Sequence, residues 1–125
     1  MIEKTVAEKA RVKPGVAVAT INAVQPVVDC LGLPGDAVFV APDAADIVML
    51  FVNTQAELDA ELPKAVAALK PGAAVWVFFK KGAKAAGYDM NRDSVWYAAE
   101  PLGLRPLGIV GIDDTWSAFR LRPGA

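Results

Sequence analysis

Two runs of apolar residues dominate the hydrophobic pattern of the chain. Residues 45–52 are apolar apart from Asp46, and residues 73–79 are apolar throughout. Neither run alternates with polar residues, which is typical of strands buried on both faces of a parallel sheet. A helical pattern separates the two runs, so residues 45–79 are predicted to form a right-handed βαβ unit.

The intervening helix is predicted from its cap and its apolar face. Thr54 and Glu57 have capping-box spacing. Pro63 interrupts the helical pattern, so we expect a kink or a break there. The apolar face consists of Leu58, Leu62, Val66 and Leu69.

The residues before this unit predict a helix over about 2–11, a strand at 16–21 and a short helix at about 24–31. Lys-Pro-Gly junctions precede the strands that begin near residues 16 and 73. Residues 37–41 lie too close to 46–52 to be its parallel neighbour, because parallel neighbours need a crossover of about a dozen residues. They are therefore predicted to be a short edge strand or an extended loop, and 16–21 and 46–52 to be parallel neighbours.

The last third of the chain predicts a helix and a hairpin. The helix, capped by Asp89 or Asn91, extends to about Leu102 with Gly103 after it, and the strands at 107–112 and 116–122 are antiparallel. The predicted fold class is α/β: one domain over 1–125, with a three-layer, Rossmann-like, mostly parallel sheet of five to six strands and a C-terminal antiparallel hairpin.

Composition adds expectations about assembly and location. The chain has 125 residues, 54% of them hydrophobic, with a mean hydropathy of +0.34. Its apolar runs fall short of the roughly 20 residues that span a bilayer, and no signal-peptide pattern opens it, so no membrane association is expected. The apolar excess predicts a subunit interface, and hence a homo-oligomer such as a dimer. The lone Cys30 favours a cytoplasmic location, where thiols stay reduced.

Several classes of chemistry are excluded by composition. The chain contains no histidine, which removes Ser-His-Asp and Cys-His catalysis and histidine-ligated metals. No metal site is therefore expected. The formal net charge is −1, so nucleic acid is not an expected partner.

Several sequence motifs of the chain resemble those of two known protein families. The Lys-Pro-Gly entry into the first strand, residues 45–52 and the closing hairpin resemble class I S-adenosylmethionine-dependent methyltransferases. The chain is also similar to a family of short bacterial proteins of unknown function. The residues that carry this second resemblance are Val12-Lys13-Pro14-Gly15, Leu69-Lys70-Pro71-Gly72, Asn91-Arg92-Asp93, Trp96 and Ile112-Asp113-Asp114-Thr115-Trp116-Ser117. The resemblance implies a truncated, methyltransferase-like Rossmann fold and imports no catalytic residue.

Two departures from the methyltransferase pattern bear on the cofactor. The loop at residues 22–26 contains no glycine, and residues 31–46 leave no room for the second βα unit, whose acid Asp43 could replace. The resemblance implies S-adenosylmethionine, but these departures argue against it, so we expect no cofactor.

Ligands of open α/β sheets bind at the carboxyl ends of the strands. In one interpretation Lys80 or Arg92 holds a small anionic ligand, Asp113 or Asp114 accepts a proton, and Trp116 stacks. The residues predicted at this edge are Asn22, Asn53, Lys80, Lys81, Asn91, Arg92, Asp93, Asp113, Asp114 and Trp116.

A structural interpretation explains the same residues without a ligand. The two aspartates are common in hairpin turns, Trp116 would fill the core, and Arg92 would pair with Asp113 or Asp114. Two functional hypotheses follow. The first is a non-enzymatic, methyltransferase-like binding or assembly domain. The alternative is a small enzyme or small-molecule-binding protein that uses Lys80 and the Arg92, Asp114 and Trp116 side chains at this edge.

Overall fold

The computed structural model describes residues 12, 15–29, 31–33, 35–80, 92–112 and 116–123, which form a single six-stranded sheet with helices. The strands are β1 (Ala17–Ile21), β2 (Val38–Phe39), β3 (Ile47–Phe51), β4 (Ala74–Lys80), β5 (Leu104–Gly111) and β6 (Trp116–Pro123). The α-helices are α2 (Gln25–Asp29), α3 (Gln55–Ala68) and α4 (Arg92–Ala99), and the 3-10 helices are η1 (Pro42–Ala44) and η2 (Glu100–Leu102).

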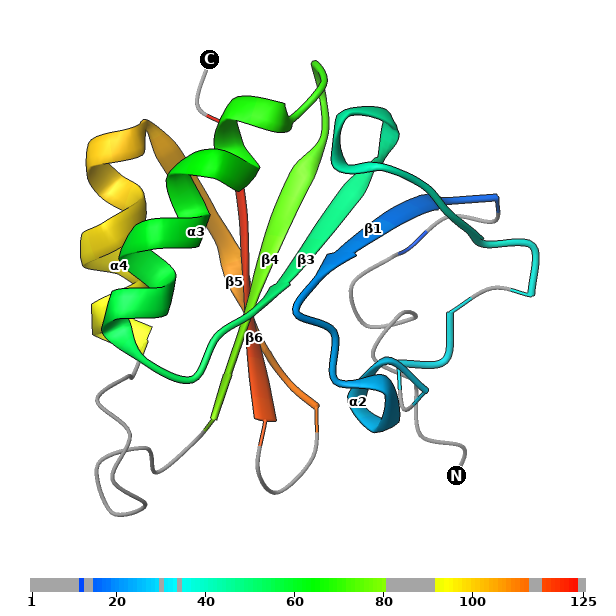
Figure 1. Cartoon of the computed structure of the whole chain (residues 1–125), viewed down its shortest axis with the longest axis horizontal. Helices are drawn as coiled ribbons and strands as arrows, with labels where there is room; N and C mark the ends of the chain where they lie inside the picture. Colours follow the sequence, from blue (N-terminus) through cyan, green and yellow to red (C-terminus); the bar gives the residue numbers. More distant parts are fainter. Residues whose placement is uncertain are drawn as a thin grey trace.

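The strand order is β2-β1-β3-β4-β6-β5. Strands β2, β1, β3 and β4 are mutually parallel, and β6 lies antiparallel between β4 and β5 (Figure 1). The predicted α/β fold class, the parallel pairing of β1 with β3 and the closing hairpin are all confirmed. β5 is parallel to β4, as expected from the predicted helical crossover between them.

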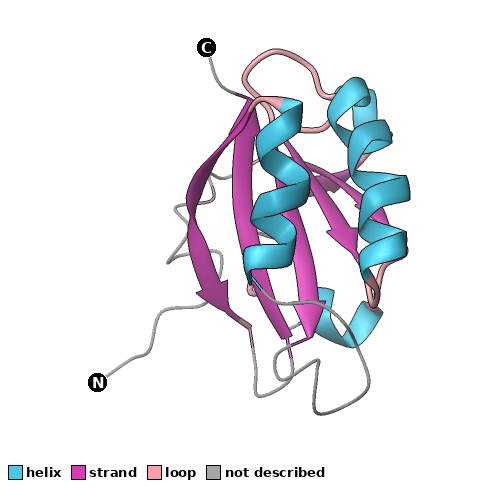
Figure 2. Ribbon diagram, turned by 90° about the vertical axis from the view of Figure 1, so that its left-hand side faces the viewer, coloured by secondary structure: helices cyan, strands magenta, loops and turns pink. Residues whose placement is uncertain are grey.

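Helices cover the two faces of the sheet unequally. Helices α3 and α4 lie side by side on one face (Figure 2), where Leu58 and Leu62 of α3 pack against Val48 and Leu50 of β3. The short α2 contributes Val28 to the core of the opposite face. No helix in the described part of the chain is long and apolar enough to cross a membrane.

The core confirms that the two apolar runs are strands buried on both faces. All five residues of β3 are buried, and so are the five central residues of β4. Phe51 and Phe78 stack with their ring centroids 4.4 Å apart. Trp76 and Phe79 are also core residues, at 3% and 5% exposure.

Several predicted details are refined by the structure. Residues 37–41 contain the edge strand β2, which pairs with β1. Helix α3 continues past Pro63 to Ala68, so the chain does not break there. Helix α2 is shorter than the predicted 24–31, whereas both hairpin strands are longer than predicted. The helix predicted at 2–11 lies outside the described residues.

Candidate functional site at the carboxyl edge of the sheet

The carboxyl ends of β1 and β3 flank a change in the direction of chain winding. From β1 the chain passes to β2 on one side and then returns to β3 on the other side. In open α/β sheets this switch in strand order leaves a crevice beyond the strand ends, where ligands bind. Asn22 follows β1 and Asn53 lies two residues beyond β3, so both predicted residues border the switch point, at the lower end of the sheet in Figure 1.

Asn22 allows the chain to turn sharply after β1. Its φ is 58°, in the left-handed region that asparagine accepts more readily than other non-glycine residues. The chain thus makes the left-handed turn after β1 at Asn22 without a glycine. Pro26 then occupies the second position of α2, within the first turn where proline is tolerated.

Asn53 presents a buried polar atom at the switch point. Its Oδ1 is buried and has no hydrogen-bond partner. The neighbouring Thr54 caps α3, because its Oγ1 accepts a hydrogen bond of 3.1 Å from the Glu57 N–H. The backbone on the other side is also fixed, since the Val52 N–H donates to the Phe78 carbonyl at 3.1 Å. Asn53 is thus held between a strand end and a helix cap.

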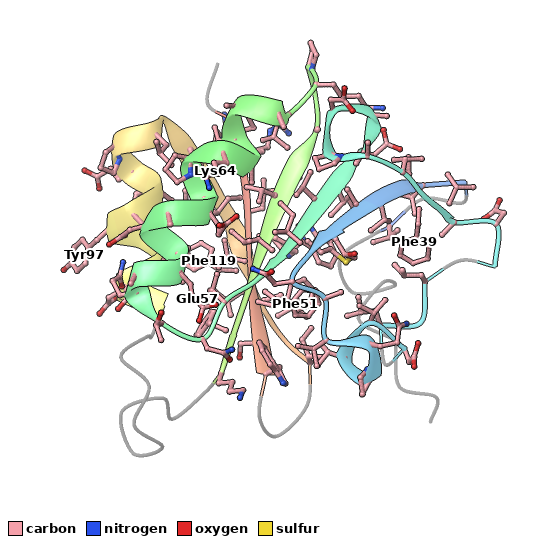
Figure 3. All side chains as sticks on the ribbon, in the orientation of Figure 1. Phe39, Phe51, Glu57, Lys64, Tyr97 and Phe119 are labelled. Carbon is pink, nitrogen blue, oxygen red and sulfur yellow. The ribbon has the colours of Figure 1, made fainter. Side chains whose placement is uncertain are left out.

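Lys80 and Trp116 lie side by side further along the edge. They are direct cross-strand partners, and the Lys80 Nζ lies 5.5 Å from the centroid of the Trp116 ring. Trp116 is only 6% exposed and packs edge-on against Phe51 at 5.8 Å between centroids. Trp116 therefore belongs to the aromatic core beneath the carboxyl edge, next to Phe51, which is labelled in Figure 3.

The remaining predicted residues divide into two groups. Arg92 begins α4, and the exposed Asp93 borders a cavity of about 320 Å³ between α4 and the hairpin, with Trp96, Pro106, Ile109 and Phe119. The second group lies outside the described residues and consists of Lys81, Asn91, Asp113 and Asp114. The expected ion pair of Arg92 with Asp113 or Asp114 therefore also lies outside them.

Sequence reasoning missed a charged cluster at the opposite, amino edge. The Asp46 carboxylate accepts a hydrogen bond of 2.9 Å from the Ala17 N–H, and its other oxygen lies 2.9 Å from the Lys70 Nζ. The Ala17 N–H and the Lys70 ammonium lower the pKa of Asp46 below its ordinary value of 3.8. Asp46 thereby ties β1 to the Lys-Pro-Gly junction before β4. The sequence analysis noted Lys70 in its Lys-Pro-Gly junction, but its contact with Asp46 depends on the register between β3 and β4.

The segment before β3 agrees with the prediction that residues 31–46 leave no room for a complete second βα unit. Residues 31–46 hold a strand that pairs with β1, followed by η1 in place of a full helix. Asp43 lies in η1 and is exposed, but η1 is at the amino edge of the sheet, where the Lys70 Nζ donates to the Ala44 carbonyl at 3.2 Å, so Asp43 does not lie beside Asn22 and Asn53.

Comparison with solved structures identifies the fold. The chain is similar to a TehB-like SAM-dependent methyltransferase from Corynebacterium glutamicum, with a TM-score of 0.55 and 10% identity, over 94% of this chain and 85% of that one. It is similar to the B. subtilis tRNA methyltransferase TrmK (TM-score 0.58, 10% identity, 99% and 67% coverage). It also resembles the mitomycin 7-O-methyltransferase MmcR (TM-score 0.61, 12% identity), covering 88% of this chain but 49% of that one.

These likenesses define a methyltransferase-like, Rossmann-type fold. No protein-family model and no curated protein matches the sequence. The predicted scaffold is therefore confirmed at the level of the fold.

Proposed function

We propose that this domain binds a small polar ligand at the carboxyl edge between β1 and β3, and that this ligand is S-adenosylmethionine or its demethylated product. The observation that carries the proposal is the Asn53 Oδ1, which is buried at the switch point and has no hydrogen-bond partner. The fold supports the choice of ligand, because the similar solved structures include SAM-dependent methyltransferases.

The chemistry of the edge fits a ligand that carries hydrogen-bond donors. An unpaired buried acceptor costs about 1–3 kcal/mol, and a bound donor group offsets this cost. S-adenosylmethionine carries amino and hydroxyl donors. The residues that would hold it are Asn53 and the left-handed turn at Asn22.

The proposal concerns binding and assigns no catalytic residue. Histidine is absent from the chain. The acids predicted to accept a proton, Asp113 and Asp114, lie outside the described residues.

Isothermal titration calorimetry with S-adenosylmethionine and S-adenosylhomocysteine tests the proposal. We expect micromolar binding of at least one of them by the wild-type protein, and a loss of about tenfold or more in Asn53→Leu, as expected for one buried hydrogen bond. Lys64→Ala is the matched control, because the Lys64 side chain lies on α3 and is 73% exposed. Absence of binding to both compounds, or equal binding by Asn53→Leu, would refute the proposal.

A second candidate function, assembly, is favoured by apolar side chains on the outer strands. Val38 and Phe39 of β2 are 50% and 61% exposed, and Leu107 and Ile109 of β5 are each 41% exposed. Edge strands present unpaired backbone groups that can pair with another chain. Figure 3 shows Phe39 at the β2 side of the molecule, far from α3 and α4.

Strand β2 is the better candidate for such an interface. Strand β5 contains Pro106 and a bulge before Gly108, two features that hinder edge-to-edge pairing. Strand β2 contains only Val38 and Phe39, with no charge or proline. A homodimer through β2 would cover both exposed apolar side chains.

Light scattering coupled to size-exclusion chromatography tests this candidate. We expect a dimer mass at micromolar concentration and a monomer mass for Phe39→Lys, because a lysine on an edge strand opposes pairing. Tyr97→Lys is the control, since Tyr97 is 73% exposed on α4. A monomer mass for the wild-type protein would exclude the dimer.

A further inference from the structure

Three arginines occupy one face of the β5–β6 hairpin. Arg105 is the direct cross-strand partner of Arg122, and Arg120 precedes Arg122 by two residues on β6. Direct partners, and residues two apart on a strand, share a face of the sheet. Arg120 is also the partner of Trp76, which lies in the same core cluster as Val28 of α2. The arginine cluster (Arg105, Arg120 and Arg122) therefore lies on the face opposite α3 and α4.

No acid neutralises this cluster among the described residues. The ion pairs of Lys64 with Glu61 and of Lys70 with Asp46 involve none of the three arginines. Like charges placed directly opposite each other on neighbouring strands repel, so the Arg105 and Arg122 pairing is unfavourable by itself. The chain as a whole has a net charge of −1, so the local excess of three positive charges is not a consequence of a basic composition.

Arg120 shows that the cluster is more than a set of solvated surface charges. Its side chain is partly buried, and its Nε is buried with no hydrogen-bond partner. Among the described residues its guanidinium makes one hydrogen bond, from Nη2 to the Leu107 carbonyl at 3.5 Å, which is long for a hydrogen bond. A guanidinium remains charged at all ordinary pH values, and a partly buried charge without a counter-charge is unfavourable.

The backbone of β5 makes room for this guanidinium. Gly108 lies opposite Arg120 next to the bulge and has a φ of 133°, which side-chain-bearing residues rarely adopt. A Cβ at Gly108 would approach the Arg120 Nη2 to 3.1 Å. The bulge and the glycine together make room on β5 for the Arg120 guanidinium.

The arginine cluster is separate from the carboxyl-edge site. Trp116 pairs with Lys80 at the carboxyl end of β4, whereas Leu121, between Arg120 and Arg122, pairs with Val75 near its amino end. Arg122 also borders a cavity of about 330 Å³ at the amino edge of the sheet. The inference drawn from the cluster is therefore independent of the proposed function.

We propose that the arginine cluster binds a small anion with two or more linked phosphate groups, such as a pyrophosphate moiety. Arginine forks match phosphate oxygens with paired hydrogen bonds. Direct partners across antiparallel strands are about 5 Å apart, and residues two apart on a strand are about 6.6 Å apart. Three arginines whose Cα atoms have these spacings can reach adjacent phosphates together, whereas a single phosphate engages only part of the set.

Calorimetry of the full chain at low ionic strength, with sodium pyrophosphate and sodium orthophosphate as probes, tests this inference. We expect saturable binding of pyrophosphate that is about tenfold or more tighter than that of orthophosphate. Arg105→Gln and Arg122→Gln alter exposed side chains, and each should weaken pyrophosphate binding about tenfold. Lys64→Gln, which removes an exposed cation on the opposite face, should leave it unchanged.

Four results would overturn the inference: no saturable binding of pyrophosphate, equal affinity for both anions, unchanged affinity in the two exposed arginine variants, or an equal loss in Lys64→Gln. A single-stranded RNA oligonucleotide is the third probe. Binding of RNA without binding of pyrophosphate would also overturn it, because the cluster would then serve a nucleic-acid backbone. Circular dichroism of each variant confirms that it is folded.

Discussion

Replacing Asn53 by leucine should stabilise the protein. Burial of a polar atom without a hydrogen bond costs about 1–3 kcal/mol, and leucine has a similar shape without that atom. Because only part of the Asn53 side chain is buried, we take the lower limit, an increase of about 1 kcal/mol in the free energy of unfolding. For a domain of this size that corresponds to a rise of about 4 °C in Tm.

Chemical and thermal denaturation followed by circular dichroism measure this change. Asn22→Leu is the matched control at the same edge, and it should have the opposite effect. Asn22 has a φ of 58°, and a leucine in the left-handed region costs about 1 kcal/mol or more. If Asn53→Leu instead lowers the free energy of unfolding by about 1 kcal/mol, Asn53 makes a hydrogen bond in the folded protein and the reasoning is wrong.

Three further predictions concern the scaffold. Phe78→Ala should cost about 3–5 kcal/mol by urea denaturation, since Phe78 is 0% exposed, whereas a loss under about 1 kcal/mol would show that β4 is not central. Thr54→Ala should remove the α3 cap and cost about 1 kcal/mol, with Thr54→Ser retaining most of the stability; equal losses would exclude the cap. Asp46→Asn should cost about 0.5–1 kcal/mol at pH 7, a small value because the carboxylate is 49% exposed.

The Asp46 prediction includes a pH dependence. The pKa of Asp46 is lowered in the folded protein by the Ala17 N–H and then by Lys70, so its stabilisation is full above the unfolded value of 3.8. It is lost as the pH falls through the folded pKa. The difference in free energy of unfolding between wild type and Asp46→Asn should therefore be constant near neutral pH and shrink as the pH falls below about 5. A difference that grows over this range would contradict the assignment.

The fold was predictable because short stretches of the sequence indicate which strands are buried and where the helices begin and end. The runs that form β3 and β4 lack polar alternation, and the Thr54 cap and Gly103 mark where helical segments begin and end. The position of β2 was left open, because a two-residue strand has no periodicity of its own. Its pairing depends on the register with β1, which tertiary structure determines.

The candidate site was predictable only in its position. The rule that ligands bind at carboxyl strand ends identified Asn22 and Asn53 as edge residues. It did not indicate that Asn22 takes the left-handed conformation or that the Asn53 Oδ1 is buried. Trp116 was assigned two roles from the sequence, and its packing against Phe51 favours the core role. The arginine cluster was not predicted, because it depends on the hairpin register and on the bulge before Gly108.

The central claim is that a ligand binds at the switch point between β1 and β3. The most direct test is a two-dimensional ¹⁵N–¹H NMR titration of the protein with S-adenosylmethionine. The account predicts that the largest shifts are those of the amides of Ala23, Val24, Asn53 and Thr54, which lie at the ends of β1 and β3. Shifts concentrated on the β5–β6 hairpin instead, or no shifts at millimolar ligand, would contradict it.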